Sequence, residues 1–230
     1  MRYHLLIPSA GKGSRFQGDV PKQYWMLEGK AVLVHALERI ASALPLHQAC
    51  VAVQPGDRWY DETVGALPRV TLLRCGGSTR AETVRNALSA MTDVGDEDWV
   101  LVHDAVRPCI DAASLSRLRN ELRDEEVGGL LAVPVVGTLK RADPQQRSAA
   151  TESRERLWSA QTPQMFRFRV LRRAFAHPGV LDCTDEAQAV EALGEAPRLV
   201  MGDPANLKIT YPGDLALAAA IMSLQRQAAG

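Results

Sequence analysis

The sequence has few cysteines and no excess charge of either sign, and both features limit what the protein can be. Its four cysteines, Cys50, Cys75, Cys109 and Cys183, are widely spaced and form no Cys-x-x-Cys pair. This spacing predicts reduced core thiols rather than a disulfide framework, as expected of a cytoplasmic protein. Lysine and arginine together number 27, as do aspartate and glutamate, so the formal net charge is zero. Nucleic acid, a long anionic polymer, is therefore not an expected partner.

Long apolar runs and an N-terminal targeting segment are also missing. The longest late apolar run, Leu215 to Met222, is too short to cross a bilayer. Residues Met1 to His4 do not form the charged lead of a secretory signal followed by a long apolar segment. We therefore expect no membrane contact. With 230 residues, 46% of them hydrophobic, the chain can bury one sizeable core, and we expect a single domain over residues 1–230.

Glycines and basic residues are concentrated near the N-terminus, directly after a short apolar run. The run Leu5–Ile7 predicts a buried strand, and the loop that follows contains Gly11, Lys12, Gly13 and Arg15. Glycines let backbone N–H groups approach an anion closely, and the cations add charge at the same place. The stretch therefore predicts a phosphate site at the carboxyl end of a sheet, with an ordinary glycine turn and solvated cations as the alternative.

Two well-known phosphate loops do not match this stretch. The dinucleotide fingerprint requires a third glycine where this chain has Phe16, and the ATPase loop requires Gly-Lys-Ser/Thr where Asp19 follows Gly18. What remains is Gly-x-Gly-x-Arg followed by Pro-Lys-Gln-Tyr at residues 21–24. This combination resembles the signature of nucleotidylyltransferases, which make CDP- or NDP-activated small molecules.

Beyond this loop the chain alternates between strand-like and helix-like stretches. Strands are expected at residues 5–7, 49–53, 70–73, 99–102, 128–135, 198–201 and 208–210. Helices are expected at residues 31–44, 58–67, 80–91, 114–124, 170–176, 185–193 and 212–225. We expect Ser78 or Thr79 to cap the third of these helices and Thr184 the sixth. The alternation predicts an α/β protein with a mostly parallel sheet covered by helices on both faces.

The alternation stops at Val136, and residues 137–159 are polar without a clear period. Residues 138–140 and 156–158 could form the two sides of a long hairpin. A structureless loop of this length would be unusual inside a compact domain, so we expect the segment to project. Its apolar flanks, Leu139, Leu157 and Trp158, need a surface to bury against, which a second subunit would supply. We therefore predict a dimerisation arm at residues 137–159, with a flexible surface loop as the alternative.

The residues that could carry chemistry follow predicted strands, where open α/β sheets bind ligands. Arg15 and Lys22 follow the first strand, Asp104 and Arg107 the fourth, and Lys208 lies in the last. These residues are cations and one carboxylate, and the sequence shows neither a nucleophile–base pair nor the spacing of zinc ligands. Such a set suits nucleotidyl or phosphoryl transfer between two anions. Asp104 could bind Mg²⁺ together with nucleotide phosphates, or it could simply pair with Arg107. Lys208 by itself is interpreted more simply as a solvated lysine.

Taken together, motifs from residue 8 to residue 210 resemble the family of 2-C-methyl-D-erythritol 4-phosphate cytidylyltransferases. The matching pieces, in order, are PSAGKGSRF, PKQY, GGSTRAETV, VLVHDAVRPC, PVVGTLKRA, LWSAQTPQMF, TDEAQAVE and NLKIT. The resemblance implies a Rossmann-like α/β fold with a projecting β-arm, and a homodimer in which the arms interlock. It also implies a Mg²⁺-dependent reaction in which CTP and methylerythritol phosphate give CDP-methylerythritol and pyrophosphate.

The resemblance also implies roles for individual residues. Gly77 and Thr83 would meet the cytosine, and Asp104 would be the metal ligand. The implied nucleotide-binding residues are Ala10, Gly11, Gly13, Arg15, Lys22, Gly77, Thr83, Asp104 and Ala105. The implied catalytic cations are Arg15, Lys22 and Lys208. The second substrate would be bound by Arg107, Thr138, Arg154, Thr162, Thr184 and Lys208, with Thr138 and Arg154 on the partner's arm. A second metal carboxylate that related sugar nucleotidylyltransferases often have is replaced here by Ala205, so Asp104 could be the only protein ligand of the metal.

Two other functions remain open from the sequence. A cytidylyltransferase for another polyol phosphate, such as ribitol 5-phosphate, would share the phosphate loop and much of the cytosine site. Thr138, Lys140 and Arg154 favour the methylerythritol substrate over that one. A non-catalytic nucleotide-binding homologue is the other alternative, and the joint presence of the cations and Asp104 argues against it.

Overall fold

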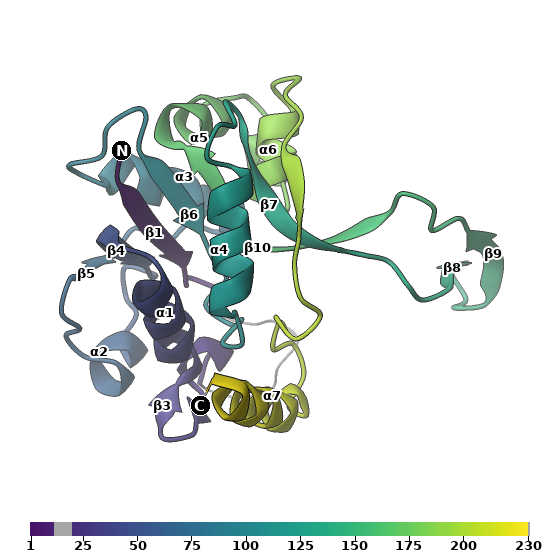
Figure 1. Ribbon diagram of the computed structural model, residues 1–230, viewed down its shortest axis with the longest axis horizontal. Helices are drawn as coiled ribbons and strands as arrows, with labels where there is room; N and C mark the ends of the chain where they lie inside the picture. Colours follow the sequence, from purple (N-terminus) through teal and green to yellow (C-terminus); the bar gives the residue numbers. More distant parts are fainter. Residues whose placement is uncertain (12–19, 230) are drawn as a thin grey trace.

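The centre of the molecule is a mostly parallel sheet, as the sequence predicts. The structure, a computed structural model, describes residues 1–11 and 20–229. Within these residues a seven-stranded sheet has the order β11-β7-β10-β6-β1-β4-β5 (Figure 1). Only β10 runs antiparallel to its neighbours, β6 and β7, so the expected α/β class is confirmed. The strands are β1 (Tyr3–Pro8), β4 (Leu46–Ala52), β5 (Val70–Leu73), β6 (Trp99–Val102), β7 (Gly128–Pro134), β10 (Trp158–Arg167) and β11 (Arg198–Met201).

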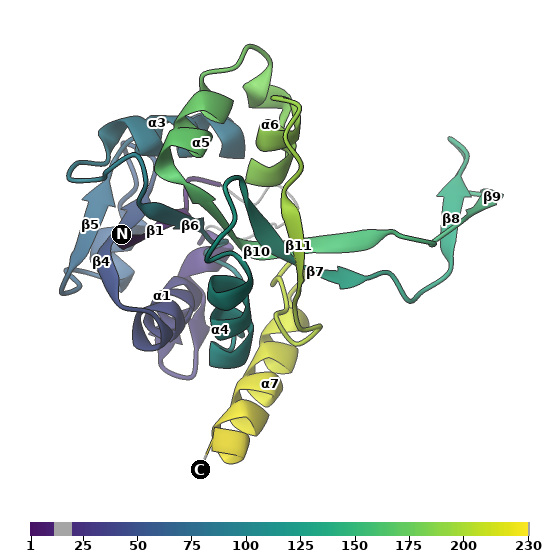
Figure 2. The ribbon, with the colours of Figure 1, turned by 45° about the horizontal axis from the view of Figure 1, so that its top comes forward.

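Helices cover both faces of the sheet (Figures 1 and 2). Strand β1 shows why, because Leu5 and Ile7 belong to the core on one face and Leu6 to the core on the other. Strands that are apolar on both sides must be covered on both sides. The first face packs against α1 (Val32–Ala43) and α4 (Ala112–Glu121), and the second against α3 (Arg80–Ala90), α5 (Phe168–Phe175) and α6 (Glu186–Glu191).

Smaller elements and a C-terminal helix complete the body. They are η1 (Lys22–Tyr24), β2 (Met26–Leu27), β3 (Lys30–Ala31), α2 (Trp59–Thr63), η2 (Val180–Asp182) and α7 (Asp214–Ala229). Helix α7 packs Ala218 and Met222 against a third small core that includes Val32 and Cys109. Over residues 1–11 and 20–229, no helix combines the length and apolarity that crossing a bilayer requires.

A hairpin projects from one side of the body, which agrees with the expectation that residues 137–159 project (Figures 1 and 2). Its strands are β8 (Leu139–Ala142) and β9 (Ser148–Glu152), which pair antiparallel from Leu139 opposite Glu152. The expected pairing of residues 138–140 with 156–158 is therefore wrong. Trp158 instead begins β10 and lies opposite Pro134, so the β7–β10 ladder extends to the base of the arm.

Three local expectations are also wrong. Residues 208–210 form no strand, because the N–H of Ile209 donates to the carbonyl of Val106 at 2.9 Å and not to a neighbouring strand. Helix α6 is capped by Asp185, whose side chain accepts from the N–H of Gln188, rather than by Thr184. Helix α7 begins at Asp214, not at Pro212. In contrast, Thr79 caps α3 as expected.

A buried carboxylate, Asp98, ties the start of β1 to the start of β6. Its oxygens accept from the N–H groups of Arg2 and Gly95, the side chain of Arg2 and Nε2 of His4, at 2.9 to 3.2 Å. Burial alone would raise the pKa of Asp98, but these donors hold it well below its usual range. The carboxylate is therefore charged and fully engaged at neutral pH.

We expect Asp98→Asn to lower the free energy of unfolding by about 2–3 kcal/mol, because a neutral amide cannot satisfy donors arranged around a carboxylate. Since the folded-state pKa of Asp98 lies below its ordinary value, this contribution is present above about pH 4 and is lost as the pH falls through the folded-state pKa. Urea denaturation at neutral and acidic pH measures the difference. The control Asp96→Asn, at an exposed position, should shift stability by less than about 0.5 kcal/mol. Equal stability of Asp98→Asn and wild type at pH 7 would contradict this account.

Candidate active site

Two adjoining pockets lie at the carboxyl ends of the parallel strands. The larger has a volume of about 260 Å³ and the smaller about 130 Å³. Arg80, Asp104 and Lys208 line both pockets, and we call these three residues the shared wall. The predicted residues that line the larger pocket are Ala10, Gly11, Lys22, Gly77, Thr83, Asp104, Ala105 and Lys208. The structure thus brings together all of the predicted nucleotide-binding residues that it describes.

Side-chain amides hold the two glycine-containing loops of the larger pocket together. Nε2 of Gln54 donates to the carbonyls of Ala10 at 3.1 Å and Gly77 at 2.8 Å. Nε2 of Gln23 donates to the carbonyl of Gly11 at 3.2 Å. A Cβ on Gly76 would lie 2.5 Å from the Cβ of Ala10, so only glycine at this position allows the loops to approach this closely. Sequence reasoning did not identify Gln54, because a lone glutamine carries no pattern.

Thr83 supports the loop that contains Gly77. Its hydroxyl oxygen accepts from the N–H of Gly77 at 3.1 Å, and the hydroxyl donates to the carbonyl of Thr79 at 2.9 Å. Thr83 is buried and lies one turn into α3, below the loop. The side chain therefore shapes the floor of the larger pocket and fixes the direction of the Gly77 N–H.

Lys22 connects the N-terminal loop to the segment around Lys208. It lies in η1 and lines the larger pocket, and its Nζ donates to the carbonyl of Ile209 at 2.9 Å. Residues 22 and 208 are far apart in the chain but contribute cations to the same pocket. Two further predicted residues, Gly13 and Arg15, lie outside the described residues.

Asp104 is surrounded by three cations. Its carboxylate lies 2.8 Å from Nζ of Lys208, 3.3 Å from the guanidinium of Arg80 and 3.5 Å from Nε of Arg107. Burial alone would raise the pKa of Asp104, but the charges of Arg80, Lys208 and Arg107 hold it well below its usual range. The pairing with Arg107 that the sequence suggested is present, but it is the longest of the three. Lys208 is ion-paired, not only solvated.

The smaller pocket contains part of the predicted second-substrate site. Arg107, Thr162 and Thr184 line it together with the shared wall. Thr138 and Arg154 line neither pocket; both are exposed residues of the projecting arm, and Arg154 donates to the carbonyl of Val136. Within one described chain, therefore, the arm residues do not reach the pockets.

The hydroxyl of Thr162 is engaged in a buried chain of hydrogen bonds. It accepts from the N–H of Asp104 at 3.0 Å and donates to Nδ1 of His103 at 3.0 Å. Burial lowers the pKa of His103 to about 4, so the ring is neutral, and its Nε2 donates to the carbonyl of Arg107 at 3.1 Å. This chain of hydrogen bonds fixes the loop that carries Asp104 and Arg107. Thr162 therefore orients this loop as well as lining the pocket.

Sequence reasoning missed two charged residues of the site, Arg80 and Glu186. Arg80 begins α3, and its Nη1 and Nη2 lie 2.6 and 3.1 Å from the two carboxylate oxygens of Glu186. Glu186 is fully buried at the start of α6. Burial raises the pKa of Glu186 and is opposed by the charge of Arg80. Both residues lie inside motifs that carry the resemblance, GGSTRAETV and TDEAQAVE, which was the available signal.

Asp104 fits a Mg²⁺ ion as one ligand among several. In nucleotide sites Mg²⁺ keeps waters and phosphate oxygens besides one or two carboxylates. Within the part of the chain that the structure describes, no three His, Cys, Asp or Glu side chains gather as a metal-binding group. Asp203, close to the place of the second carboxylate in related enzymes, accepts from the N–H of Ala205 at 2.7 Å and is not among the described residues that line either pocket. The ionised Asp104 therefore suits a metal held mainly by nucleotide phosphates.

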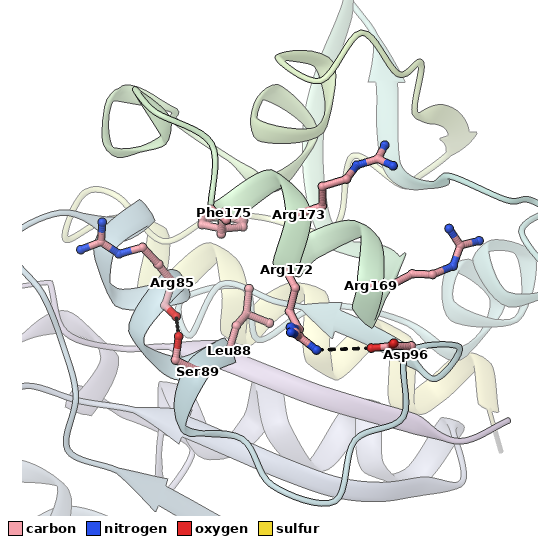
Figure 3. A pocket seen from close by; sticks show the side chains of 9 residues that line it. Arg85, Leu88, Ser89, Asp96, Arg169, Arg172, Arg173 and Phe175 are labelled. Atoms are coloured by element: carbon pink, nitrogen blue, oxygen red, sulfur yellow. Dashed lines mark hydrogen bonds and ion pairs between the residues drawn. The ribbon is translucent and has the colours of Figure 1, made fainter.

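A larger hollow of about 620 Å³ between α3 and α5 is not the candidate site. Four arginines line it, and in Figure 3 their guanidinium groups point in different directions. Each is paired with a carboxylate, so the hollow has no excess positive charge directed at one point. The pairs are Arg85–Glu82 at 3.6 Å, Arg169–Glu97 at 2.7 Å, Arg172–Asp96 at 3.4 Å and Arg173–Glu195.

Comparison with known proteins gives a consistent result over nearly the whole chain. The sequence profile of the 2-C-methyl-D-erythritol 4-phosphate cytidylyltransferase family matches residues 3–224. A protein of that name from Nitrosospira multiformis is 50% identical over 225 residues, covering 96% of this chain and 97% of its own length. A protein of the same name from Dechloromonas aromatica is 49% identical over 230 residues, covering 98% of this chain and 99% of its own length.

Solved structures agree in fold as well as in sequence. A crystal structure of 4-diphosphocytidyl-2C-methyl-D-erythritol synthase is 39% identical with a TM-score of 0.86, covering 96% of this chain and all of that one. The 2-C-methyl-D-erythritol 4-phosphate cytidylyltransferase of Francisella tularensis is 32% identical with a TM-score of 0.84 at the same coverage. Sequence, fold and the arrangement of the two pockets thus lead to one conclusion: this chain belongs to the 2-C-methyl-D-erythritol 4-phosphate cytidylyltransferase family.

Proposed function

We propose that this protein transfers CMP from CTP to 2-C-methyl-D-erythritol 4-phosphate, giving 4-diphosphocytidyl-2-C-methyl-D-erythritol and pyrophosphate. The observation that carries the proposal is the wall that the two pockets share. Arg80, Asp104 and Lys208 line both pockets, so two bound substrates would meet there. Family membership supplies the identity of the substrates.

The reaction is a direct in-line displacement. CTP occupies the larger pocket, and the phosphate of the polyol attacks the α-phosphate of CTP from the smaller pocket, with pyrophosphate as the leaving group. A phosphate monoester is already ionised near neutral pH, because its second pKa is about 6, so the attacking oxygen needs no general base. This agrees with the role of the buried His103, whose hydrogen bonds hold a loop of the site.

Cations at the shared wall make the encounter of two anions possible. Two negatively charged substrates repel each other, and fixed positive charges in a site with little water offset this repulsion most effectively. Lys22 and Lys208 lie in the larger pocket, and Arg107 lies in the smaller. Arg80 lines both pockets, and Arg15 adds a fifth cation to the proposal on the strength of its motif. A Mg²⁺ ion held by the nucleotide phosphates and Asp104 would further neutralise the triphosphate.

The remaining nucleotide contacts follow from the loops of the larger pocket. Ala10, Gly11 and Gly13 are proposed to place backbone N–H groups around the triphosphate. Gly77, held by Gln54 and Thr83, is proposed to contact the cytosine, and Ala105, which also lines this pocket, is proposed to lie beside the ribose. A pocket of about 260 Å³ whose floor is fixed by hydrogen bonds would disfavour a larger purine base.

The second substrate is proposed to need two subunits. Arg107, Thr162 and Thr184 lie in the smaller pocket, whereas Thr138 and Arg154 are on the arm. A homodimer in which each arm extends over the neighbour would bring these two residues to the neighbour's smaller pocket. Large exposed apolar side chains near the base of the arm, Val136 and Leu157, support the proposal because a second subunit could cover them. We also propose a cytoplasmic location, which the four free cysteines support.

A pyrophosphate-release assay tests the function. The protein is given CTP and Mg²⁺ with either methylerythritol phosphate or ribitol 5-phosphate. Release with the first and little with the second is the expected result. Preference for ribitol 5-phosphate would assign the chain to another polyol, and CTP binding without release with either would indicate a non-catalytic homologue.

Shortening the arm should impair use of the polyol phosphate more than binding of CTP. We expect deletion of residues 142–153 to raise the KM for methylerythritol phosphate by about 10–100-fold, the scale of losing one or two hydrogen bonds to a charged group. Arg154→Ala should act in the same direction, whereas Arg147→Ala at the tip of the arm serves as the matched control. Steady-state kinetics and CTP titration measure the two effects. Equal losses for both substrates, or a monomeric mass at micromolar concentration, would contradict the two-subunit site.

A further inference from the structure

Three charged side chains form a continuous chain from α6 to the shared wall. The two carboxylate oxygens of Glu186 lie 2.6 and 3.1 Å from Nη1 and Nη2 of Arg80. On its other side, the Arg80 guanidinium lies 3.3 Å from Oδ1 of Asp104. Arg80 is thus held between two carboxylates, one on the first turn of α6 and one in the loop after β6.

A contribution to folding stability does not by itself explain the Arg80–Glu186 ion pair. Glu186 is completely buried and the Arg80 side chain is 26% exposed. An ion pair with a buried carboxylate seldom stabilises a protein more than apolar side chains of similar size would. Among the described residues, Arg80 is the group that hydrogen-bonds the Glu186 carboxylate. The carboxylate therefore has one identifiable effect, which is to orient the guanidinium of Arg80.

Arg80 occupies a position where its orientation matters for both substrates. It is the first residue of α3, directly after the loop 77–79 that lines the larger pocket. Glu186 begins α6, directly after Thr184 and Asp185, which line the smaller pocket. The Arg80–Glu186 pair thus joins the two pockets at their common boundary, where the reacting phosphates meet in the proposed function.

The attachment of α6 makes this support rigid. Gln164 of β10 accepts from the N–H of Ala187 at 2.8 Å through Oε1 and donates to Asp185 at 3.0 Å through Nε2. The first turn of α6 is therefore fixed to the central sheet. A carboxylate on this turn can hold a guanidinium at one place, since these hydrogen bonds fix the start of the helix to the sheet.

We propose that Glu186 is a positioning residue for cytidylyl transfer, which holds the Arg80 guanidinium at the shared wall so that Arg80 contacts substrate phosphate. The proposal rests on the proposed function for the reaction that Arg80 serves. Without the charge of Glu186, Arg80 would retain Asp104 as its ion-pair partner among the described residues and would move toward it. A displacement of about 1 Å at a reacting centre can lower a rate about 10²-fold.

A double-mutant cycle tests this role. We expect Glu186→Gln to lower kcat by about 10–100-fold and to weaken CTP binding by about 5–10-fold, through loss of a precisely held guanidinium. Arg80→Lys keeps the charge but loses the planar two-pronged contact, and it should have effects of similar size. If Glu186 acts only through Arg80, the double variant should match Arg80→Lys within about threefold in both kcat and CTP affinity. The matched control is Glu191→Gln, at the exposed last residue of α6, which should behave as wild type.

A purely structural role for Glu186 predicts a different result. Additive losses in the double variant, or a kcat of Glu186→Gln within about threefold of wild type, would overturn the proposal. If Glu186→Gln does not fold, Arg80→Met/Glu186→Met removes both charges together and leaves no buried charge unpaired. This variant should melt at or above the wild-type temperature but show a kcat at least about tenfold lower, and wild-type activity in it would refute the proposal.

Calorimetric titration with CTP separates this proposal from the proposed function. A wild-type protein that binds CTP but transfers to no polyol phosphate would refute the function. The CTP affinities of the two single variants and the double variant would still show whether Glu186 acts through Arg80.

Discussion

Lys22→Ala is expected to lower the kcat of cytidylyl transfer by about 10²–10³-fold, the scale of losing one preorganised group that stabilises developing charge. Lys22 lines the larger pocket, and its Nζ donates to the carbonyl of Ile209, the residue after Lys208. In the proposed function, the ammonium group is thus held near the place where charge builds up on the phosphates. Removing it leaves that charge without one of its cations.

Steady-state kinetics with saturating CTP and methylerythritol phosphate measure the effect of Lys22→Ala. The control is Lys30→Ala, because Lys30 is half exposed and pairs with Glu38 outside both pockets. We expect the control to retain wild-type turnover. Arg15→Ala should resemble Lys22→Ala on the strength of its motif. Near-normal turnover in both Arg15→Ala and Lys22→Ala would remove the catalytic assignment of these cations.

Asp104→Asn should lower kcat by about 10³-fold while leaving metal-free CTP binding as tight as in wild type, or tighter. The substitution removes the only negative charge of the shared wall, and the cations 2.8 to 3.5 Å from it would then attract the triphosphate more strongly. Turnover falls because those same cations are no longer held in place. A carboxylate able to share a metal with the phosphates is lost as well.

Comparing CTP titration without metal to turnover with Mg²⁺ separates these effects for Asp104→Asn. The control Asp96→Asn changes an exposed carboxylate outside both pockets and should alter neither quantity. A variant with weaker CTP binding and unchanged kcat would show that Asp104 holds the nucleotide in its ground state and has no special role in the transfer step.

The strands and helices with strong periodicity were predictable, and the exceptions have physical reasons. β5, β6 and β11 begin and end at the residues predicted from the sequence. β10 was not predicted, because only its inner part is buried and its outer part continues into the arm. Residues 208–210 form no strand although they alternate in polarity, because the backbone of Ile209 bonds to Val106 and the side chain of Lys208 to Asp104.

The residues of the candidate site also fall into two groups, those that motifs indicate and those that only the folded structure brings together. Gly11, Lys22, Gly77, Asp104 and Lys208 could be named from motifs, since each chemical type has a clear use around phosphate. Residues whose work depends on a distant partner could not be named this way. Gln54 joins two loops that are far apart in the chain, and the partners Arg80 and Glu186 are 106 residues apart.

The sequence by itself determined the α/β class, the family resemblance and most of the residues proposed to face a phosphate, because local patterns and motif chemistry need no knowledge of distant contacts. Only the tertiary structure decided that Asp104 lies among three cations, that Thr162 supports its loop through His103, and that a buried glutamate pairs with Arg80. These features depend on which segments fold side by side. Which segments lie side by side is determined by the packing of the whole core and cannot be inferred from any single stretch of the chain.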